Sequence, residues 1–524
     1  MIPGSFFTPL MSRSKRFVTN LMSSYAAIGI NILYTVVSIP LALHYLDKEE
    51  FGLWALVTQM AGYLMLLEFG MSGSVARSLS DHKDEIENGV YGSILKTGAR
   101  VFMIQAAAIV LLGLALAWFA PSMMNLPEHL HRPFILLMSA QALLNGVKLS
   151  VGSLASPLWS HQRLDISNLA GSSSMIVTFA VLWLGFHLGW HIYSLTVATA
   201  VGFCVSTAMI WISCRRLGLY APKAYRGRFD PVLFKQLFHF GGDLFLLNLG
   251  AQLLSASQVI VVSRLLGIES AAVWAIATKI FSLAQQFVSK ILESSVGGLT
   301  EIFVRKETDT LKKRFHDVVA ISAVMAVAAS AGIALMNGPF IEIWTAGKVS
   351  WSPWNNFFLA CVLFSTAVTR CHIGLVGISK EIRGMKYANL IEGVAFVVFS
   401  VASVKSFGFA GILISALVCN ICITGAYGVI RTASHFEIRN LNVAGWIGRP
   451  VLILLLTLAL FPLTLVPFIA GQVALLRFVV GAGLFIVCII PALWFFGMNP
   501  VFQSELAGIT AKICRNAKSK LGLT

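Results

Sequence analysis

Charged residues are scarce in this sequence. Only 12% of its 524 residues are Asp, Glu, Lys or Arg, whereas a soluble globular protein carries about 25%. Acidic residues are the scarcer class, with 23 Asp and Glu against 39 Lys and Arg, while hydrophobic residues make up 57% of the chain. A soluble fold cannot hide so much apolar surface. The composition therefore excludes a soluble enzyme.

Long polar segments are also missing, which leaves no room for a soluble catalytic domain. The net charge of +16 is spread over short blocks of Lys and Arg between apolar stretches. A nucleic-acid-binding protein instead gathers such residues on one soluble face or helix. We therefore expect no nucleic-acid partner, and the blocks are typical of the loops of a membrane protein.

The eight cysteines give no sign of a disulfide framework, because none lies in a loop that we expect on the outer side of the membrane. Cys419 and Cys422 form a CxxC pair inside a predicted span, where small polarizable Cys is an ordinary core residue. His161 and His372 are isolated and lack the spacing of metal ligands. We therefore expect no metal site and no cofactor.

Apolar stretches recur from Phe17 to Phe496. A transmembrane helix needs about 20 mostly apolar residues, and these stretches have that length. We predict an all-α integral membrane protein with about fourteen transmembrane helices. The predicted spans are 17–43, 51–76, 97–119, 133–155, 166–186, 191–213, 241–263, 271–293, 317–340, 355–375, 387–404, 407–430, 450–468 and 474–496.

Lys and Arg are distributed unevenly over the connections. The connections on the side of the N-terminus hold 30 Lys and Arg residues, and those on the opposite side hold five. In this count the run from Arg370 to Lys386 is the connection after the tenth span. Cytoplasmic loops of membrane proteins carry the excess of Lys and Arg. We therefore predict that both termini are cytoplasmic.

The chain contains a weak internal repeat with an offset of 220 residues. When the sequence is aligned with itself at this offset, Leu53-Trp54-Ala55-Leu56 matches Val273-Trp274-Ala275-Ile276, and Arg163 matches Arg383. Six spans separate the partners, so both copies keep one orientation, as in transporters with parallel repeats. The predicted domains are a six-helix lobe at 1–213, a basic cytoplasmic linker at 214–240, a second six-helix lobe at 241–430, two additional helices at 431–496 and a basic cytoplasmic tail at 497–524.

Several short motifs accompany this layout. They are Tyr45-Leu46-Asp47-Lys48-Glu49-Glu50-Phe51-Gly52-Leu53-Trp54, Leu66-Leu67-Glu68-Phe69-Gly70, His161-Gln162-Arg163 and Phe340-Ile341-Glu342-Ile343-Trp344. With them the chain resembles the polysaccharide transporter (oligosaccharide, or O-antigen-type, flippase) family, which shares a superfamily with lipid II flippases and multidrug and toxin extrusion carriers. The resemblance implies two lobes around a cavity lined by spans 1, 2, 7 and 8. These lobes would rock between inward- and outward-facing states to move an undecaprenyl-diphosphate-linked oligosaccharide outward.

Successive residues of a helix are rotated by about 100°, so side chains whose directions differ by less than about 60° share one face. By this criterion three of these four spans carry polar residues on one face. The faces are Asn20, Ser24, Asn31, Thr35 and Ser38 in span 1, Asn248, Gln252 and Ser255 in span 7, and, within a slightly wider arc, Lys279, Ser282, Gln286, Lys290 and Glu293 in span 8. We predict that the substrate is bound by Lys279, Gln286, Ser282, Asn31, Gln59, Gln252 and Lys148. The alternative is that Ser, Thr and Asn only hydrogen-bond between packed helices.

Charged residues inside spans are costly and mark functional positions. Lys279 lies about eight residues below the outer end of span 8, and we predict that it faces the cavity, with snorkelling to the interface as the alternative. For Lys148 and Lys290 we expect snorkelling or local pairing to compete with a substrate role, and we expect Arg477 to snorkel. The predicted ion-coupling or gating residues are Glu68, Asp243 and Glu392. They would either couple transport to a proton or cation or form salt bridges between the lobes that hold one conformation shut, and the sequence does not decide between the two.

The sequence thus predicts a flippase, not an enzyme, in the bacterial cytoplasmic (inner) membrane, serving cell-surface polysaccharide (O-antigen, lipopolysaccharide) synthesis. Expected partners are the lipid-linked oligosaccharide, membrane lipids, a coupling cation (H+ or Na+) and other polysaccharide assembly proteins. One alternative is a multidrug and toxin extrusion-type antiporter, although its cationic substrates would favour acids over Lys279 and Lys290. A membrane polysaccharide polymerase or ligase would need a sizeable outward loop with catalytic residues, and every outward loop is shorter than about 16 residues.

Overall fold

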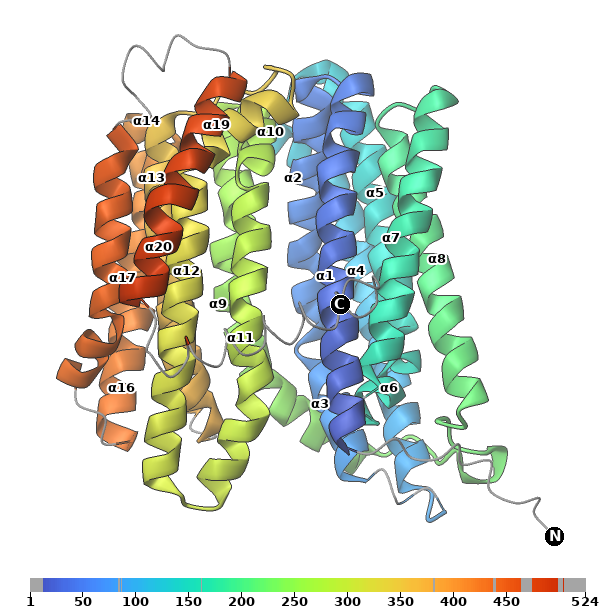
Figure 1. Ribbon diagram of the computed structural model, residues 1–524. Coiled ribbons are helices and arrows are strands. Elements are labelled where there is room, and N and C mark those ends of the chain that lie inside the picture. The colour runs from blue at the N-terminus through green and yellow to red at the C-terminus, as the bar shows by residue number, and fades with distance from the viewer. Residues whose placement is uncertain are drawn as a thin grey trace, which may run out of the picture. The chain divides into compact units, whose positions relative to one another are not determined.

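The structure, a computed structural model, describes residues 13–82, 85, 87–161, 163–379, 382–436, 440–462, 474–497 and 503. All regular secondary structure in these ranges is helical, and no strand occurs among them. Figure 1 shows the helices running side by side within each part of the chain. The predicted all-α class is confirmed.

Thirteen helices of the described ranges are long and apolar enough to cross a membrane. In chain order they are formed by α1 (Arg13–Tyr45), α2 (Lys48–Leu64) with η1 (Met65–Glu68), α4 (Val90–Met123), α5 (Glu128–Ser150), α7 (Leu164–His187), α8 (Tyr193–Arg216), α9 (Pro231–Leu266), α10 (Ile268–Ala277) with α11 (Lys279–Val304), α12 (Thr308–Trp344), α13 (Pro353–Ile378), α14 (Ile382–Phe407), α15 (Phe409–Cys419) with η4 (Asn420–Gly425) and α16 (Ala426–Phe436), and α19 (Ala474–Leu484) with η6 (Phe485–Ile489), α20 (Ile490–Ala492) and η7 (Leu493–Gly497). The predicted span 450–468 begins in α17 (Asn440–Leu460), and its part from 463 onward lies outside the described residues.

The remaining helical elements are short. They are α3 (Met71–Asp81), η2 (Gly152–Leu154), α6 (Ser156–Ser160) and η3 (Lys223–Tyr225). The break between η1 and α3 lies at Phe69 and Gly70, which are both in the left-handed backbone region. Glycine adopts this conformation without strain, which makes it a usual residue at such a break.

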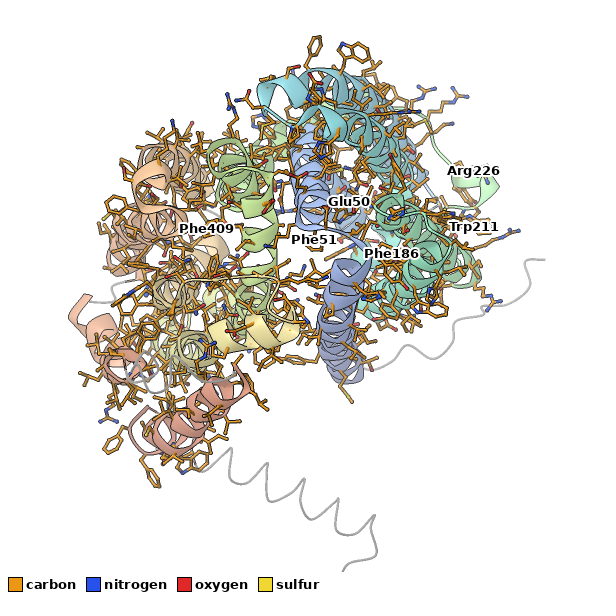
Figure 2. All side chains as sticks on the ribbon, turned by 90° about the horizontal axis from the view of Figure 1, so that it is seen from above. Glu50, Phe51, Phe186, Trp211, Arg226 and Phe409 are labelled. Carbon is orange, nitrogen blue, oxygen red and sulfur yellow. The ribbon has the colours of Figure 1, made fainter. Side chains whose placement is uncertain are left out.

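The chain divides into two compact units, residues 1–275 and 276–524. Seen along the helix axes, each unit presents its helices nearly end-on (Figure 2). The first unit contains α9, which packs along α2, η1 and α3. The predicted lobes at 1–213 and 241–430, with their linker, added helices and tail, stay a prediction.

In the first unit α4 and α5 pack closely, as do α7 and α8. Gly113 permits the α4–α5 approach, because a Cβ atom there would overlap Ala142 on α5. Small residues at contacts are typical of membrane helices, whose association depends on van der Waals packing. Trp211 on α8 is 43% exposed and projects from the edge of this unit (Figure 2).

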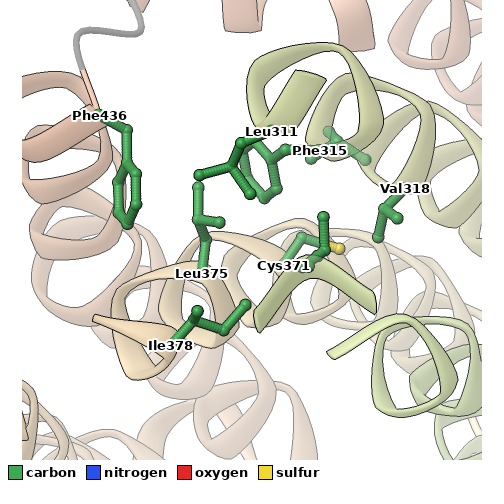
Figure 3. Packing of buried hydrophobic residues seen from close by; sticks show 9 residues of the cluster. Leu311, Phe315, Val318, Cys371, Leu375, Ile378 and Phe436 are labelled. Carbon is green, nitrogen blue, oxygen red and sulfur yellow. The ribbon is translucent and has the colours of Figure 1, made fainter. Parts of the chain in front are cut away.

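In the second unit α12 is the central helix. One end of it packs in the apolar cluster of Figure 3, which consists of Leu299, Leu311, Phe315, Val318, Val319, Cys371, Leu375, Ile378 and Phe436. A second cluster joins Val327 and Leu335 of α12 to Leu454 on α17 and to Ile489 and Leu493. Because lipid tails are as apolar as these side chains, the clusters stabilise the unit through close packing rather than through removal of water.

The prediction that Arg477 snorkels is wrong. Its guanidinium on α19 forms an ion pair with the Glu342 carboxylate on α12, and both side chains are only partly exposed. Pairing removes the need for the charge to reach the interface. The pair instead fixes α19 against α12.

Candidate functional site

The most informative feature of the second unit is a break in the eighth membrane-spanning segment. Helix α10 ends at Ala277, and α11 begins at Lys279. The side-chain amide of Asn337 on α12 donates a hydrogen bond of 3.3 Å to the carbonyl oxygen of Ala277, directly before the break. Insertion of a side chain into the backbone ladder is a recognised cause of helix kinks.

Asn337 is itself held by a buried polar network. Its amide also donates to the Asn356 side-chain oxygen of α13 over 2.8 Å, and the Trp351 indole N–H donates to the same oxygen over 2.9 Å. All three side chains are buried. Sequence analysis did not identify this network, which fixes where α11 starts and thereby the position of Lys279.

Lys279 is an exposed cation in the first turn of α11. Among the described residues it has neither a hydrogen-bond nor an ion-pair partner. One turn further along the helix, the Ser282 hydroxyl donates to the Thr278 carbonyl over 3.0 Å, so it bonds within its own helix. Gln286 is exposed. This half of α11 therefore offers a free ammonium and a free amide, which suit an anionic, hydroxyl-rich ligand.

Beside the residues of this polar face, α11 contacts α13 through Gln285 and Ser289. The Lys290 ammonium pairs with the Glu293 carboxylate on the same helix, which confirms local pairing for Lys290. Gln285 on α11 donates to the Thr366 hydroxyl on α13 over 3.4 Å, and one turn along both helices Arg370 donates to the Ser289 hydroxyl over 2.7 Å. The structure thus adds Arg370, which the sequence analysis had assigned to a connection. The position of Arg370 inside the predicted span 355–375 could have identified it as a charged residue within a span.

Lys148 on α5 is half-buried, and its ammonium lies 5.7 Å from the ring centroid of Phe203 on α8. A cation over an aromatic face is attracted by about 0.5–2 kcal/mol. This contact gives Lys148 a local packing partner. Its substrate role stays a prediction.

Gln252 on α9 lies against α2, since a Cβ atom built on Gly62 would be 2.8 Å from its side-chain nitrogen. One turn nearer the end of α9, the hydroxyls of Tyr63 and Ser257 are hydrogen-bonded. Gln59 on α2 is half-buried, like Gln252. The polar face of α9 thus meets α2, and the predicted substrate contacts of Gln59 and Gln252 stay untested.

The polar face of α1 is used largely for packing. The Asn20 side chain accepts from the Asp165 backbone N–H on α7 over 3.1 Å, and the Asn168 amide donates to Ser24 over 3.0 Å. These bonds between helices match the alternative interpretation of such residues. Asn31 is half-buried, and its substrate role stays a prediction.

Glu68 ends η1, and its carboxylate accepts the Ser72 backbone N–H over 2.8 Å. That N–H belongs to the first turn of α3, where a negative charge is favourable. The Gln105 amide donates to the Glu68 carbonyl over 2.9 Å. These contacts give Glu68 a structural task at the break before α3, and its coupling role is untested. The side chain of Asp243 lies outside the described part of the structure.

Glu392 on α14 is 3% exposed. Its carboxylate accepts hydrogen bonds from the Asn420 amide, over 3.1 Å, and from the Thr424 hydroxyl. Asn420 also accepts from the Thr369 hydroxyl of α13 over 3.2 Å. Both Asn420 and Thr424 belong to the π-helical element η4, and such elements are frequent at functional sites. Among the described residues no cation pairs with Glu392.

The described residues contain no group of three or more His, Cys, Asp or Glu that could hold a metal ion. The available chemistry is therefore that of separate charges and amides. Lys279 on α11 and Arg370 on α13 are cations without a carboxylate partner among the described residues, and Glu392 on α14 is a buried acid.

Comparisons with known proteins agree with this architecture. An inward-facing multidrug resistance MATE family transporter of the MOP superfamily is similar in fold, with a TM-score of 0.65 at 14% identity over 80% of this chain and 99% of that chain. The lipid II flippase MurJ in an inward closed conformation matches with a TM-score of 0.61 at 12% identity, covering 90% of this chain and 97% of that chain. A MOP superfamily transporter from Pyrococcus furiosus gives 0.59 at 14% identity over 81% and 97% of the two chains.

These identities are low, so the structures show the fold: a multi-pass membrane protein with the architecture of MOP superfamily transporters. A comparison with curated protein sequences gave no significant match. The family profile described as "Polysaccharide biosynthesis protein" matches residues 17–296, which is more than half of the chain. This match confirms the predicted relationship, and the chain belongs to the polysaccharide biosynthesis protein family.

Proposed function

We propose that the protein is a flippase that carries an undecaprenyl-diphosphate-linked oligosaccharide across the bacterial cytoplasmic membrane for cell-surface polysaccharide synthesis. The observation that carries the proposal is the exposed, unpaired Lys279 at the break in a membrane-spanning helix. Such a cation costs about 2.5–3.5 kcal/mol near the centre of a span. A bound anion offsets this cost.

The task follows from the chemistry of the substrate. A sugar head group and two phosphates cannot cross hydrocarbon unaided, since each unsatisfied polar group costs several kcal/mol there. The face of Lys279, Ser282 and Gln286 supplies charge and hydrogen bonds in place of water. Exposing this face alternately to the two sides of the membrane moves the head group without covalent chemistry, while the lipid tail stays in the bilayer.

Glu392 is the residue that we assign to coupling. Its partners Asn420 and Thr424 are neutral, so burial of its negative charge is offset only when it holds a proton or a small cation. A carboxylate inside a span is a default candidate for such coupling. Gain and loss of the cation would then bias the second unit between two states.

The test is genetic and biochemical. Deletion of the gene should abolish surface polysaccharide and leave the lipid-linked oligosaccharide in the inner leaflet, where an added glycosidase cannot reach it in intact spheroplasts. Normal surface polysaccharide in the deletion strain would refute the proposal. A multidrug extruder, the main alternative, would instead show increased drug sensitivity on deletion with surface polysaccharide unchanged.

A further inference from the structure

Arg370 has an unusual place in the second unit. It lies inside α13, eight residues before the end of that helix at Ile378, which corresponds to about 12 Å along the axis. From Asn355 to Ile378 it is the single exposed residue of α13. Its neighbours Thr369 and Cys371 are buried. An otherwise enclosed helix therefore presents one cation to accessible space.

The Arg370 guanidinium is directed onto the polar face of α11. It donates to the Ser289 hydroxyl over 2.7 Å, and Ser289 lies on the same face as Ser282 and Gln286, at 100° per residue. Among the described residues Arg370 has no carboxylate partner. Lys290, which follows Ser289 in the sequence, forms an ion pair with Glu293. Arg370 therefore contributes an uncompensated positive charge to this end of the face.

Snorkelling is the alternative explanation of an arginine near a span end. A snorkelling side chain extends along its own helix toward the interface. Arg370 instead crosses to α11, and a single bond to a neutral hydroxyl leaves four of its five N–H donors for another ligand. Guanidinium matches the oxygens of a phosphate in a bidentate manner, which an ammonium cannot do.

We propose that Arg370, oriented by Ser289, binds a phosphate of the lipid-linked substrate at the end of the polar face that the positive-inside rule assigns to the cytoplasm. This inference rests on the proposed function, and it adds a second anion-binding position to the one at Lys279. The two positions, Lys279 and Ser289, are ten residues apart on α11, or about 15 Å. An inner-leaflet lipid presents its diphosphate nearest to the Arg370 end.

The test measures binding by the full-length protein in nanodiscs of phosphatidylcholine, with farnesyl diphosphate as the anionic probe and farnesol as the uncharged one. Arg370→Gln should weaken farnesyl diphosphate binding about ten- to a hundredfold and leave farnesol binding unchanged. Arg370→Lys should retain part of the affinity because it keeps the charge. Ser289→Ala should cost only a few-fold, since it removes orientation but no charge.

The matched control is Arg305→Gln. Arg305 caps the C-terminal end of α11 and pairs with Glu301 in an exposed position, so its replacement should leave both affinities unchanged. Wild-type affinity of Arg370→Gln for farnesyl diphosphate would overturn the inference, as would equal losses for both probes. Displacement of the probe by phosphatidylglycerol at similar concentration would also overturn it, because the site would then bind any lipid phosphate.

Failure of the proposed function would appear elsewhere, as normal surface polysaccharide in the deletion strain. The nanodisc measurement would still decide whether Arg370 binds a diphosphate. The two failures are therefore distinguishable.

Discussion

The charge of Lys279 can be removed, reversed or kept. Lys279 is exposed and has no hydrogen-bond or ion-pair partner among the described residues, so its replacement breaks no hydrogen bond or ion pair of the fold. A hydrogen bond to a charged group contributes about 1.5–3 kcal/mol. We take the lower value because the residue is exposed, and expect Lys279→Ala to weaken substrate affinity about tenfold. Lys279→Glu adds repulsion of similar size and should cost about a hundredfold.

Export of glycan in a deletion strain, normalised to the amount of membrane-inserted protein, measures these effects. Lys279→Arg should retain most activity, because charge matters more than shape at a position without fixed partners. The control is Lys405→Gln, which replaces an exposed lysine in the last turn of α14 and should be silent. Full export by Lys279→Glu at normal abundance would refute the assignment of Lys279 to the substrate.

Three further outcomes are expected. Asn337→Ala should lower the melting temperature slightly, since the two hydrogen bonds that Asn337 makes to other helices contribute about 0.6 kcal/mol each. It should also reduce export at normal abundance because Lys279 loses its fixed position, and unchanged export would contradict this positioning role of Asn337. Glu392→Gln should leave the protein folded but make transport in proteoliposomes independent of the proton or sodium gradient, and a variant that still follows the gradient would remove Glu392 from coupling. Reporter fusions after Trp190 should be external, and those at Gly227 and at the C-terminus internal; an external C-terminus would contradict the predicted topology.

The spans could be predicted from sequence because the requirement is local: each needs about 20 apolar residues, and hydropathy along the chain reports this directly. Interruptions within spans could not be predicted in the same way. The break after Ala277 coincides with a hydrogen bond from Asn337, 60 residues further along the chain. Nothing in the sequence near Thr278 indicates which distant side-chain amide will bond to the carbonyl of Ala277.

The candidate site shows the same division between local and distant information. The polar face of α11 follows from spacing within one helix, and Lys279 and Gln286 are indeed exposed. Hydropathy could not tell which charges have partners. Arg477 was predicted to snorkel, yet its partner Glu342 lies 135 residues away. Arg370 was missed because it was counted with the basic connection after span 355–375, although it lies inside that span.

We assign the charges inside the spans to structure or to function by whether they have a partner. Inside the spans, Lys290 and Arg477 have carboxylate partners and Lys148 has an aromatic one. Lys279 and Arg370 lack a counter-charge among the described residues, although each would be less costly with one. Lys279 and the Arg370 contact at Ser289 are about 15 Å apart along α11, so they offer successive positions for one diphosphate and not two contacts to it at once. The diphosphate diester that links a polyprenyl chain to a sugar carries two negative charges at neutral pH, whereas a single phosphodiester lipid carries one.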